Sequence, residues 1–195
     1  MSPARAARAR EAATRKGSLV VRVIDYNGDG IWSRDALLAR YARYARELRV
    51  AAPLDLTPYE HATGSTRWVY PVMHKVIDGI EGGDPACVRI GLEFLEEDAR
   101  FTFGKTLKSN TARALRRATL DDGQRERVRR RVAGMLVAGQ VPHEYKEYAK
   151  LLRRVGLGGW WPYIEEHADR SNHYVRRWYD YFRRHALADP VEGRG

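Results

Sequence analysis

Apolar residues recur at helical spacing along most of the chain, and glycine, proline and aspartate interrupt them at short intervals. Met73, Val76, Ile77 and Ile80 stand at i, i+3, i+4 and i+7, which is the spacing of one helix face. The same rhythm continues to about residue 186. Helices joined by such short turns pack antiparallel. The pattern predicts an all-α fold, either an irregular helical bundle or a short HEAT-like stack of antiparallel helices.

Cap and breaker residues set the expected helix boundaries. Ser33 is a good N-cap for the first clear helix, which should end near Arg49. Asp84 and Pro85 open a later helix, because proline is favoured at the first helical position. Further helices are expected at about 67–81, 105–118, 123–138 and 143–155. A last helix, or a kinked pair re-capped at Ser171, should cover about 163–186.

Two segments before residue 67 are less regular. Residues 19–24 (LVVRVI) fit either a strand or a buried helical turn, and periodicity does not separate these at such length. Ser18 as a cap and the lack of an evident partner strand favour a helical turn. Residues 50–64 contain two prolines and a glycine and are expected to form a loop.

Length and composition predict the domain organisation. The 195 residues suit one domain at 17–188, with a disordered basic arm at 1–16 and a flexible tail at 189–195. No apolar run approaches the roughly 20 residues that span a bilayer. The first 16 residues lack the apolar core of a secretory signal. The single cysteine, Cys87, fits a reducing compartment, so we expect a cytoplasmic protein.

The positive charge is concentrated in one part of the chain. The formal net charge is +10, and residues 105–154 hold 14 Lys and Arg against 5 Asp and Glu. Residues 51–104 are acidic by comparison. A concentrated basic field attracts nucleic acid, acidic proteins or anionic surfaces. Of the basic residues 29 are arginine, whose planar fork can bind two phosphate oxygens together.

Arginine stripes on two predicted helices indicate a phosphate-binding surface. Each stripe has i, i+3, i+4 spacing, so its members share one helix face. The expected contacts are Lys105, Lys108, Arg113, Arg116, Arg117, Arg127, Arg130 and Arg131. Lys146, Lys150, Arg153 and Arg154 add to the same field. The leading interpretation is a non-enzymatic module that binds DNA or RNA mainly through phosphates. A solvated face with local ion pairs is the alternative for any one stripe.

A second interpretation is a protein-interaction or scaffold module, whose partner could be an acidic protein or another copy of the chain. Aromatic residues next to arginines are frequent anchors of protein interfaces. The candidates in the C-terminal third are Trp160, Trp161, Trp178 and Tyr181, and the acidic segment 93–98 is a second candidate surface. Packing of these aromatic side chains in the core would account for them equally well.

A third interpretation rests on residues 25–36, which resemble the start of an EF-hand calcium loop. Asp25, Asn27 and Asp29 occupy loop positions one, three and five, and Gly30 occupies position six. The resemblance fails at position twelve, where Ala36 replaces the bidentate glutamate. The alternative is an Asp/Asn/Gly turn before a capped helix. We therefore expect no cofactor, with calcium as the exception to test.

Motifs for catalysis are missing from the sequence. It contains no phosphate-binding loop of the GxxxxGK[ST] type, no GxGxxG after a strand, no GxSxG and no HExxH. The six histidines lack metal-ligand spacing. These observations favour a binding module over an enzyme.

Overall fold

Eight α-helices make up most of the described part of the chain, which the computed structural model covers at residues 22–97 and 103–186. The all-α prediction is therefore confirmed. The predicted arm (1–16) and tail (189–195) lie outside the described residues, and the domain plan stays a prediction. The helices are α2 (Arg34–Glu47), α3 (Met73–Glu81), α4 (Pro85–Glu97), α5 (Gly104–Arg117), α6 (Asp122–Val137), α7 (Tyr145–Val155), α8 (Trp160–His167) and α9 (His173–Ala186), with a short 3-10 helix η1 (Gly30–Trp32) before them.

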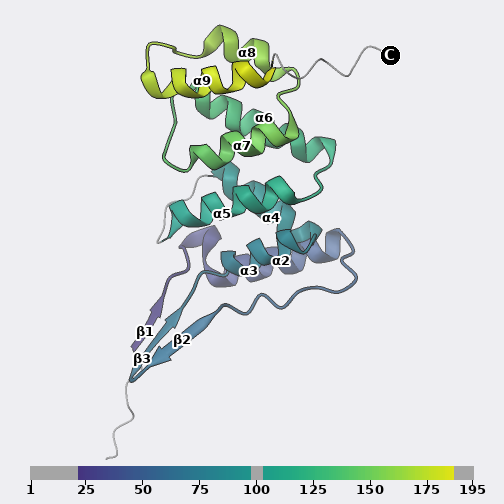
Figure 1. Ribbon diagram of the computed structural model, residues 1–195. Helices are drawn as coiled ribbons and strands as arrows, with labels where there is room; N and C mark the ends of the chain where they lie inside the picture. The colour runs from purple at the N-terminus through teal and green to yellow at the C-terminus, as the bar shows by residue number, and fades with distance from the viewer. Residues whose placement is uncertain (1–21, 98–102, 187–195) are drawn as a thin grey trace, which may run out of the picture.

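The helices stack in two layers (Figure 1). In one layer α3 packs on α5, α5 on α7, and α7 on α9. In the other α2 packs on α4, α4 on α6, and α6 on α8. From α5 to α9 short connections carry the chain from one layer to the other, whereas residues 48–72, which include β2 and β3, separate α2 from α3. Of the two predicted layouts, this is the stack.

Side-chain caps explain where several helices begin. The Ser33 hydroxyl accepts the Ala36 N–H at the start of α2. The Asp84 carboxylate accepts the Cys87 N–H at 2.8 Å, and Pro85 is the first residue of α4 as predicted. Asp121 and Gln124 form a reciprocal capping box on α6. Such caps stabilise a helix by about 1 kcal/mol each.

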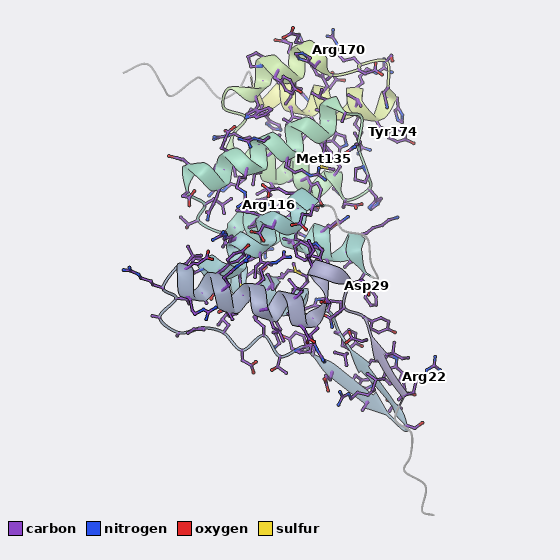
Figure 2. The ribbon with its side chains drawn as sticks, turned by 180° about the vertical axis from the view of Figure 1, so that it is seen from behind. Arg22, Asp29, Arg116, Met135, Arg170 and Tyr174 are labelled. Atoms are coloured by element: carbon purple, nitrogen blue, oxygen red, sulfur yellow. The ribbon has the colours of Figure 1, made fainter. Side chains whose placement is uncertain are left out.

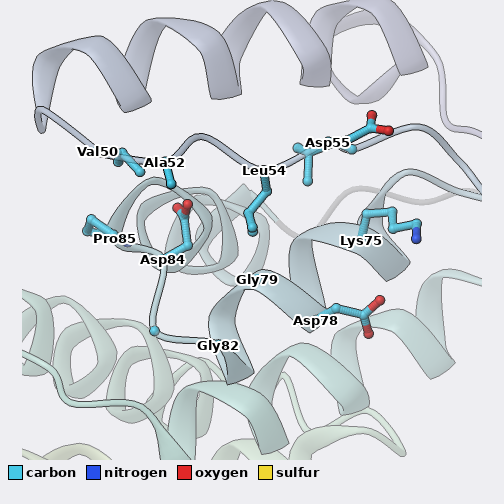
Figure 3. Close-up of a pocket in the computed structure, with 12 residues that line it drawn as sticks. Val50, Ala52, Leu54, Asp55, Lys75, Asp78, Gly79, Gly82, Asp84 and Pro85 are labelled. Carbon is cyan, nitrogen blue, oxygen red and sulfur yellow. The ribbon is translucent and has the colours of Figure 1, made fainter.

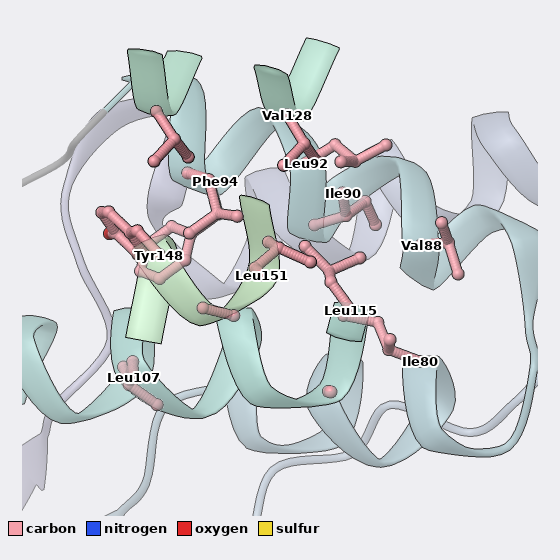
Figure 4. Packing of buried hydrophobic residues seen from close by; sticks show 14 of the residues in the cluster. Ile80, Val88, Ile90, Leu92, Phe94, Leu107, Leu115, Val128, Tyr148 and Leu151 are labelled. Atoms are coloured by element: carbon pink, nitrogen blue, oxygen red, sulfur yellow. The ribbon is translucent and has the colours of Figure 1, made fainter. Parts of the chain in front are cut away.

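One hydrophobic cluster runs through the stack from Trp32 to Phe182. Figure 4 shows its centre, where Leu115 of α5 lies beside Leu151 of α7 and Leu107 lies two turns earlier on α5, below Tyr148. These side chains are almost completely buried. Each such burial stabilises the fold by about 1.5–3 kcal/mol. The odd-numbered helices are thus held in fixed relative positions by their apolar faces.

A small sheet projects from one end of the stack (Figures 1 and 2). Its strands are β1 (Arg22–Asp25), β2 (Glu60–Thr63) and β3 (Thr66–Val69), in the order β1-β3-β2. β1 is parallel to β3, and β2 is antiparallel to it. Gly64 and Ser65 form the two-residue turn between β2 and β3, and Gly64 has φ +58°. Glycine adopts this left-handed conformation without steric cost.

The sheet corrects three predictions. The expected helical turn at 19–24 is wrong for its described residues, because Arg22, Val23 and Ile24 pair with β3. The expected loop at 50–64 includes β2. The helix expected from residue 67 begins at Met73, because residues 67–69 belong to β3 and Pro71 disfavours helical backbone at Tyr70.

The C-terminal helical segment is the predicted pair rather than one helix. α8 ends at His167 and α9 begins at His173. The cap is Asn172 and not Ser171, since the Asn172 side chain accepts the Tyr174 N–H at 3.0 Å. None of the described helices has the length and apolar content needed to cross a membrane.

Candidate functional site

Positive charge divides unequally between the two helix layers. We call the layer of α3, α5, α7 and α9 the basic layer; its helices hold 14 Lys and Arg against 4 Asp and Glu. The helices of the other layer, α2, α4, α6 and α8, hold 10 against 9. The net charge of the described helices therefore lies almost entirely on one side of the stack.

A hollow of about 600 Å³ opens on the basic layer, lined by residues of α5, α7 and α9. We call it the basic hollow. Its lining residues are Arg116, Lys150, Arg153, Arg154 and His185. Figure 2 places Arg116 near the middle of the stack's height. The lining contains four permanent cations and one imidazole, and all of them can donate hydrogen bonds to an anion.

Glu147 fixes two of these cations. Its carboxylate lies 3.4 Å from the Arg116 guanidinium and 3.3 Å from the Lys150 ammonium. The Glu147 side chain is only 15% exposed, so the pair is partly shielded from solvent. One carboxylate between two cations leaves an excess of positive charge. The contact holds Arg116 and Lys150 in place at the wall of the hollow.

Arg153 and Arg154 are exposed at the last turn of α7. Arg153 Nη1 lies 3.5 Å from His185 Nε2 of α9, and its guanidinium lies 5.9 Å from the ring of Tyr181. Arg154 has no acidic partner within the described residues. Both guanidinium groups can therefore turn toward a ligand without breaking an ion pair.

Most of the predicted phosphate contacts lie elsewhere. Only Arg116 of the eight lines the basic hollow. Arg117 pairs with Glu81 of α3 at 2.6 Å, and Arg113 donates to Asn110 at 2.7 Å on its own helix. Lys108 is almost fully buried, whereas Lys105 is exposed. The α5 stripe is thus divided among several local contacts.

The α6 stripe joins the two central helices of the other layer. Arg127 binds both carboxylate oxygens of Glu96, at 2.8 and 2.6 Å, and this pairing raises the pKa of Arg127. Arg131 donates to the Leu95 carbonyl near the end of α4 at 2.9 Å. Arg130 is exposed. The two predicted stripes lie on different layers and do not form one surface.

The stripe that lines the hollow follows the same sequence rule as the predicted ones. Lys150, Arg153 and Arg154 have i, i+3, i+4 spacing on α7. The sequence analysis included them only as additions to the basic field and not among the expected phosphate contacts. No sequence signal identifies His185, which reaches the hollow only through the packing of α9 on α7.

The acidic face of α4 is used within the molecule. Glu93 accepts the Tyr44 hydroxyl at 2.6 Å and pairs with Arg40 and Arg89. Glu97 accepts the Trp32 indole N–H at 2.8 Å, and Glu96 holds Arg127 as described above. These glutamates form ion pairs and hydrogen bonds with basic and aromatic residues of neighbouring helices.

The four aromatic interaction candidates pack against the hydrophobic cluster and are partly buried. The Trp160 indole donates to Glu126 at 2.8 Å, and Trp161 lies on Tyr179. Trp178 contacts Tyr145, and Tyr181 contacts Phe182 and His185. The protein-interaction alternative stays a prediction, and these contacts account for the four side chains as packing residues.

The EF-hand-like segment forms the junction between sheet and helices. Asp25 is in β1, and its carboxylate accepts the backbone N–H of Asn27 at 2.8 Å. The Asn27 side-chain oxygen accepts the Val72 N–H at 2.8 Å. Asp29 precedes η1 and makes no side-chain cap. Across residues 22–97 and 103–186, no group of three or more His, Cys, Asp or Glu is placed to hold a metal. Calcium binding stays a prediction.

A second hollow, of about 410 Å³, lies between the loop after α2 and the turn from α3 to α4 (Figure 3). Tyr41 links the two sides, because its hydroxyl donates to Asp84 and accepts the Leu54 N–H. Burial raises the pKa of the Cys87 thiol beneath this site, which keeps it protonated and unreactive. The groups near this hollow hold the loop in place.

Comparisons with known proteins give no assignment: no family model, curated protein or solved structure matches this chain.

Proposed function

We propose that this chain is a nucleic-acid-binding module that holds phosphate groups on its basic layer, with the basic hollow at the centre of the contact. The observation that carries the proposal is the segregation of charge onto α5, α7 and α9. These three helices together hold 13 Lys and Arg against 2 Asp and Glu. The cytoplasmic location expected from the lone cysteine remains part of this proposal.

Ion pairing separates this surface from the other arginine-rich faces. In the opposite layer, ion pairs join Arg40, Arg43, Arg89 and Arg127 to Glu47, Glu93 and Glu96. These three carboxylates offset three of the four positive charges within the molecule. Arg153 and Arg154 have no carboxylate partner among the described residues, so their charge is available to an external anion. Phosphate contacts of this kind fix the position of a nucleic acid without reading its bases.

The test is binding of a labelled random-sequence duplex and a labelled single strand, measured by fluorescence polarisation at about 50 and 200 mM salt. We expect binding that weakens steeply with salt. The variant Arg153→Glu/Arg154→Glu should reduce the slope of log K against log salt by about two, one for each lost phosphate contact. A chain lacking residues 1–16 measures the separate contribution of the basic arm.

The matched control is Arg46→Glu/Arg130→Glu, which changes net charge equally but on exposed residues of the opposite layer. It should retain most of the affinity and the salt slope. Equal loss in both variants would mean that only total charge matters, and the basic layer would lose its role. Absence of binding at the lower salt concentration would overturn the proposal.

A further inference from the structure

The basic hollow concentrates more charge than one internucleotide phosphate requires. Two helices, α5 and α7, place Arg116, Lys150, Arg153 and Arg154 around one volume, and Glu147 offsets only one of the four charges. A phosphodiester carries one negative charge with two free oxygens. A phosphomonoester carries about −1.5 to −2 at neutral pH and offers three acceptor oxygens. The charge balance therefore favours a phosphomonoester.

The placement of the donors points the same way. The cations come from α5 and α7, and His185 adds an imidazole from α9. Donors from three successive helices of one layer therefore line the same hollow, whereas a diester within a strand continues on both ends. Arginine can bind two oxygens of one phosphate through its fork. A terminal phosphate can enter such a hollow, with the strand leaving toward solvent.

The rigid and movable parts of the hollow have different roles. The ion pairs with the partly buried Glu147 hold Arg116 and Lys150 in position at the wall of the hollow before a ligand binds. Arg153 and Arg154 are exposed and can close over the ligand. The hollow is open to solvent and has a volume of about 600 Å³, which leaves room for a phosphate group.

From these observations we infer that the basic hollow binds the terminal phosphomonoester of a nucleic-acid strand. The inference rests on the proposed function, because it names the group that the same surface recognises best. No covalent step is involved, and the lining residues act only as hydrogen-bond donors and charges.

The test compares one single strand in three forms: 5′-hydroxyl, 5′-phosphate and 3′-phosphate, each labelled internally. We expect at least one phosphorylated form to bind about 10-fold more tightly than the hydroxyl form, which is the effect of one added charge-assisted interaction. Inorganic phosphate is added as a competitor. Its failure to compete at millimolar concentration would show that the attached strand contributes to binding, and strong competition would assign the site to free phosphate instead.

The variant Arg153→Gln/Arg154→Gln should lower the affinity for the phosphorylated strand to the affinity for the hydroxyl strand. Arg46→Gln/Arg130→Gln should leave the difference intact. Since all four residues are exposed, we expect both variants to keep the wild-type melting temperature. Equal affinity of all three strands, with salt-sensitive binding retained, would overturn this inference and leave the proposed function standing. Absence of binding by every strand would overturn both.

Discussion

Gly79 lies inside α3, at a point where the loop after α2 and the start of α4 both approach the helix backbone. A Cβ atom at this position would overlap the Cys87 sulfur and lie 2.9 Å from Leu54 Cδ1. Cys87 is completely buried, so its side chain has little room to move. Glycine at this position is therefore a packing requirement, although it lowers intrinsic helix propensity.

We expect Gly79→Ala to reduce the free energy of unfolding by about 1–3 kcal/mol, as overpacking of a core usually does. The measurement is urea unfolding followed by circular dichroism. Cys87→Ala removes the overlapping sulfur, so the double variant should lose less than the sum of the two single changes.

Gly134 of α6 is the matched control, because a Cβ there meets no atom within 4 Å. Gly134→Ala should stabilise the protein by about 0.5–1 kcal/mol through helix propensity alone. If Gly79→Ala also proved stabilising, the tight approach of Cys87 to α3 would be contradicted.

At the scale of elements, α4 and α6 are joined by the bidentate contact of Arg127 with Glu96. Arg127→Lys keeps the charge but loses the planar fork, so we expect a loss of up to about 1 kcal/mol for this partly exposed pair. The affinity for polyanions should not change, because the Arg127 side chain is already paired with Glu96. Urea unfolding and the polarisation assay test the two parts on the same protein.

Arg154→Ala is the opposite case. We expect it to reduce the affinity for polyanions and to leave the free energy of unfolding unchanged within about 0.5 kcal/mol. Reversal of this pattern would return the α6 stripe to the binding surface. The comparison therefore distinguishes arginines that hold helices together from arginines that are free to bind a ligand.

The helices were predictable because capping residues and apolar spacing agree locally. Ser33, Asp84 and Asp121 mark helix starts through bonds to residues three positions ahead. The sheet was missed because β2 is exposed along its whole length, which leaves no alternation of buried and exposed side chains. Its sequence signal was the Gly64–Ser65 pair, a two-residue hairpin turn.

The proposed binding surface was only partly predictable for a related reason. Residue spacing shows which arginines share a helix face, but not what packs against that face. Arg127 and Arg131 share a face that turns toward α4. Lys150, Arg153 and Arg154 share a face that lines the hollow. The difference depends on contacts between helices far apart in sequence.

At the scale of the whole molecule, each helix contacts mainly its neighbours in the stack. α5 packs against α3, α4 and α7, whereas α8 packs, among the described elements, only against α6 and α9. In such arrays stability is roughly a sum of neighbouring contacts, and the ends open most easily.

We therefore expect amide hydrogen exchange to be slowest in α5 and markedly faster in α8 and in the projecting strands β1 and β2. Mass spectrometry of peptides from native protein gives the measurement. Equal exchange rates in α5 and α8 would instead indicate that the stack opens only by complete unfolding.

The unequal charge of the two layers gives the described helices an electric dipole directed across the stack. In the field of a polyanion this dipole produces a torque, which rotates the protein so that α5, α7 and α9 face the phosphates before contact. A larger share of collisions then occurs in the productive orientation, so the association rate rises without any added contact. Two variants with the same net charge would accordingly associate at different rates if that charge were divided differently between the layers.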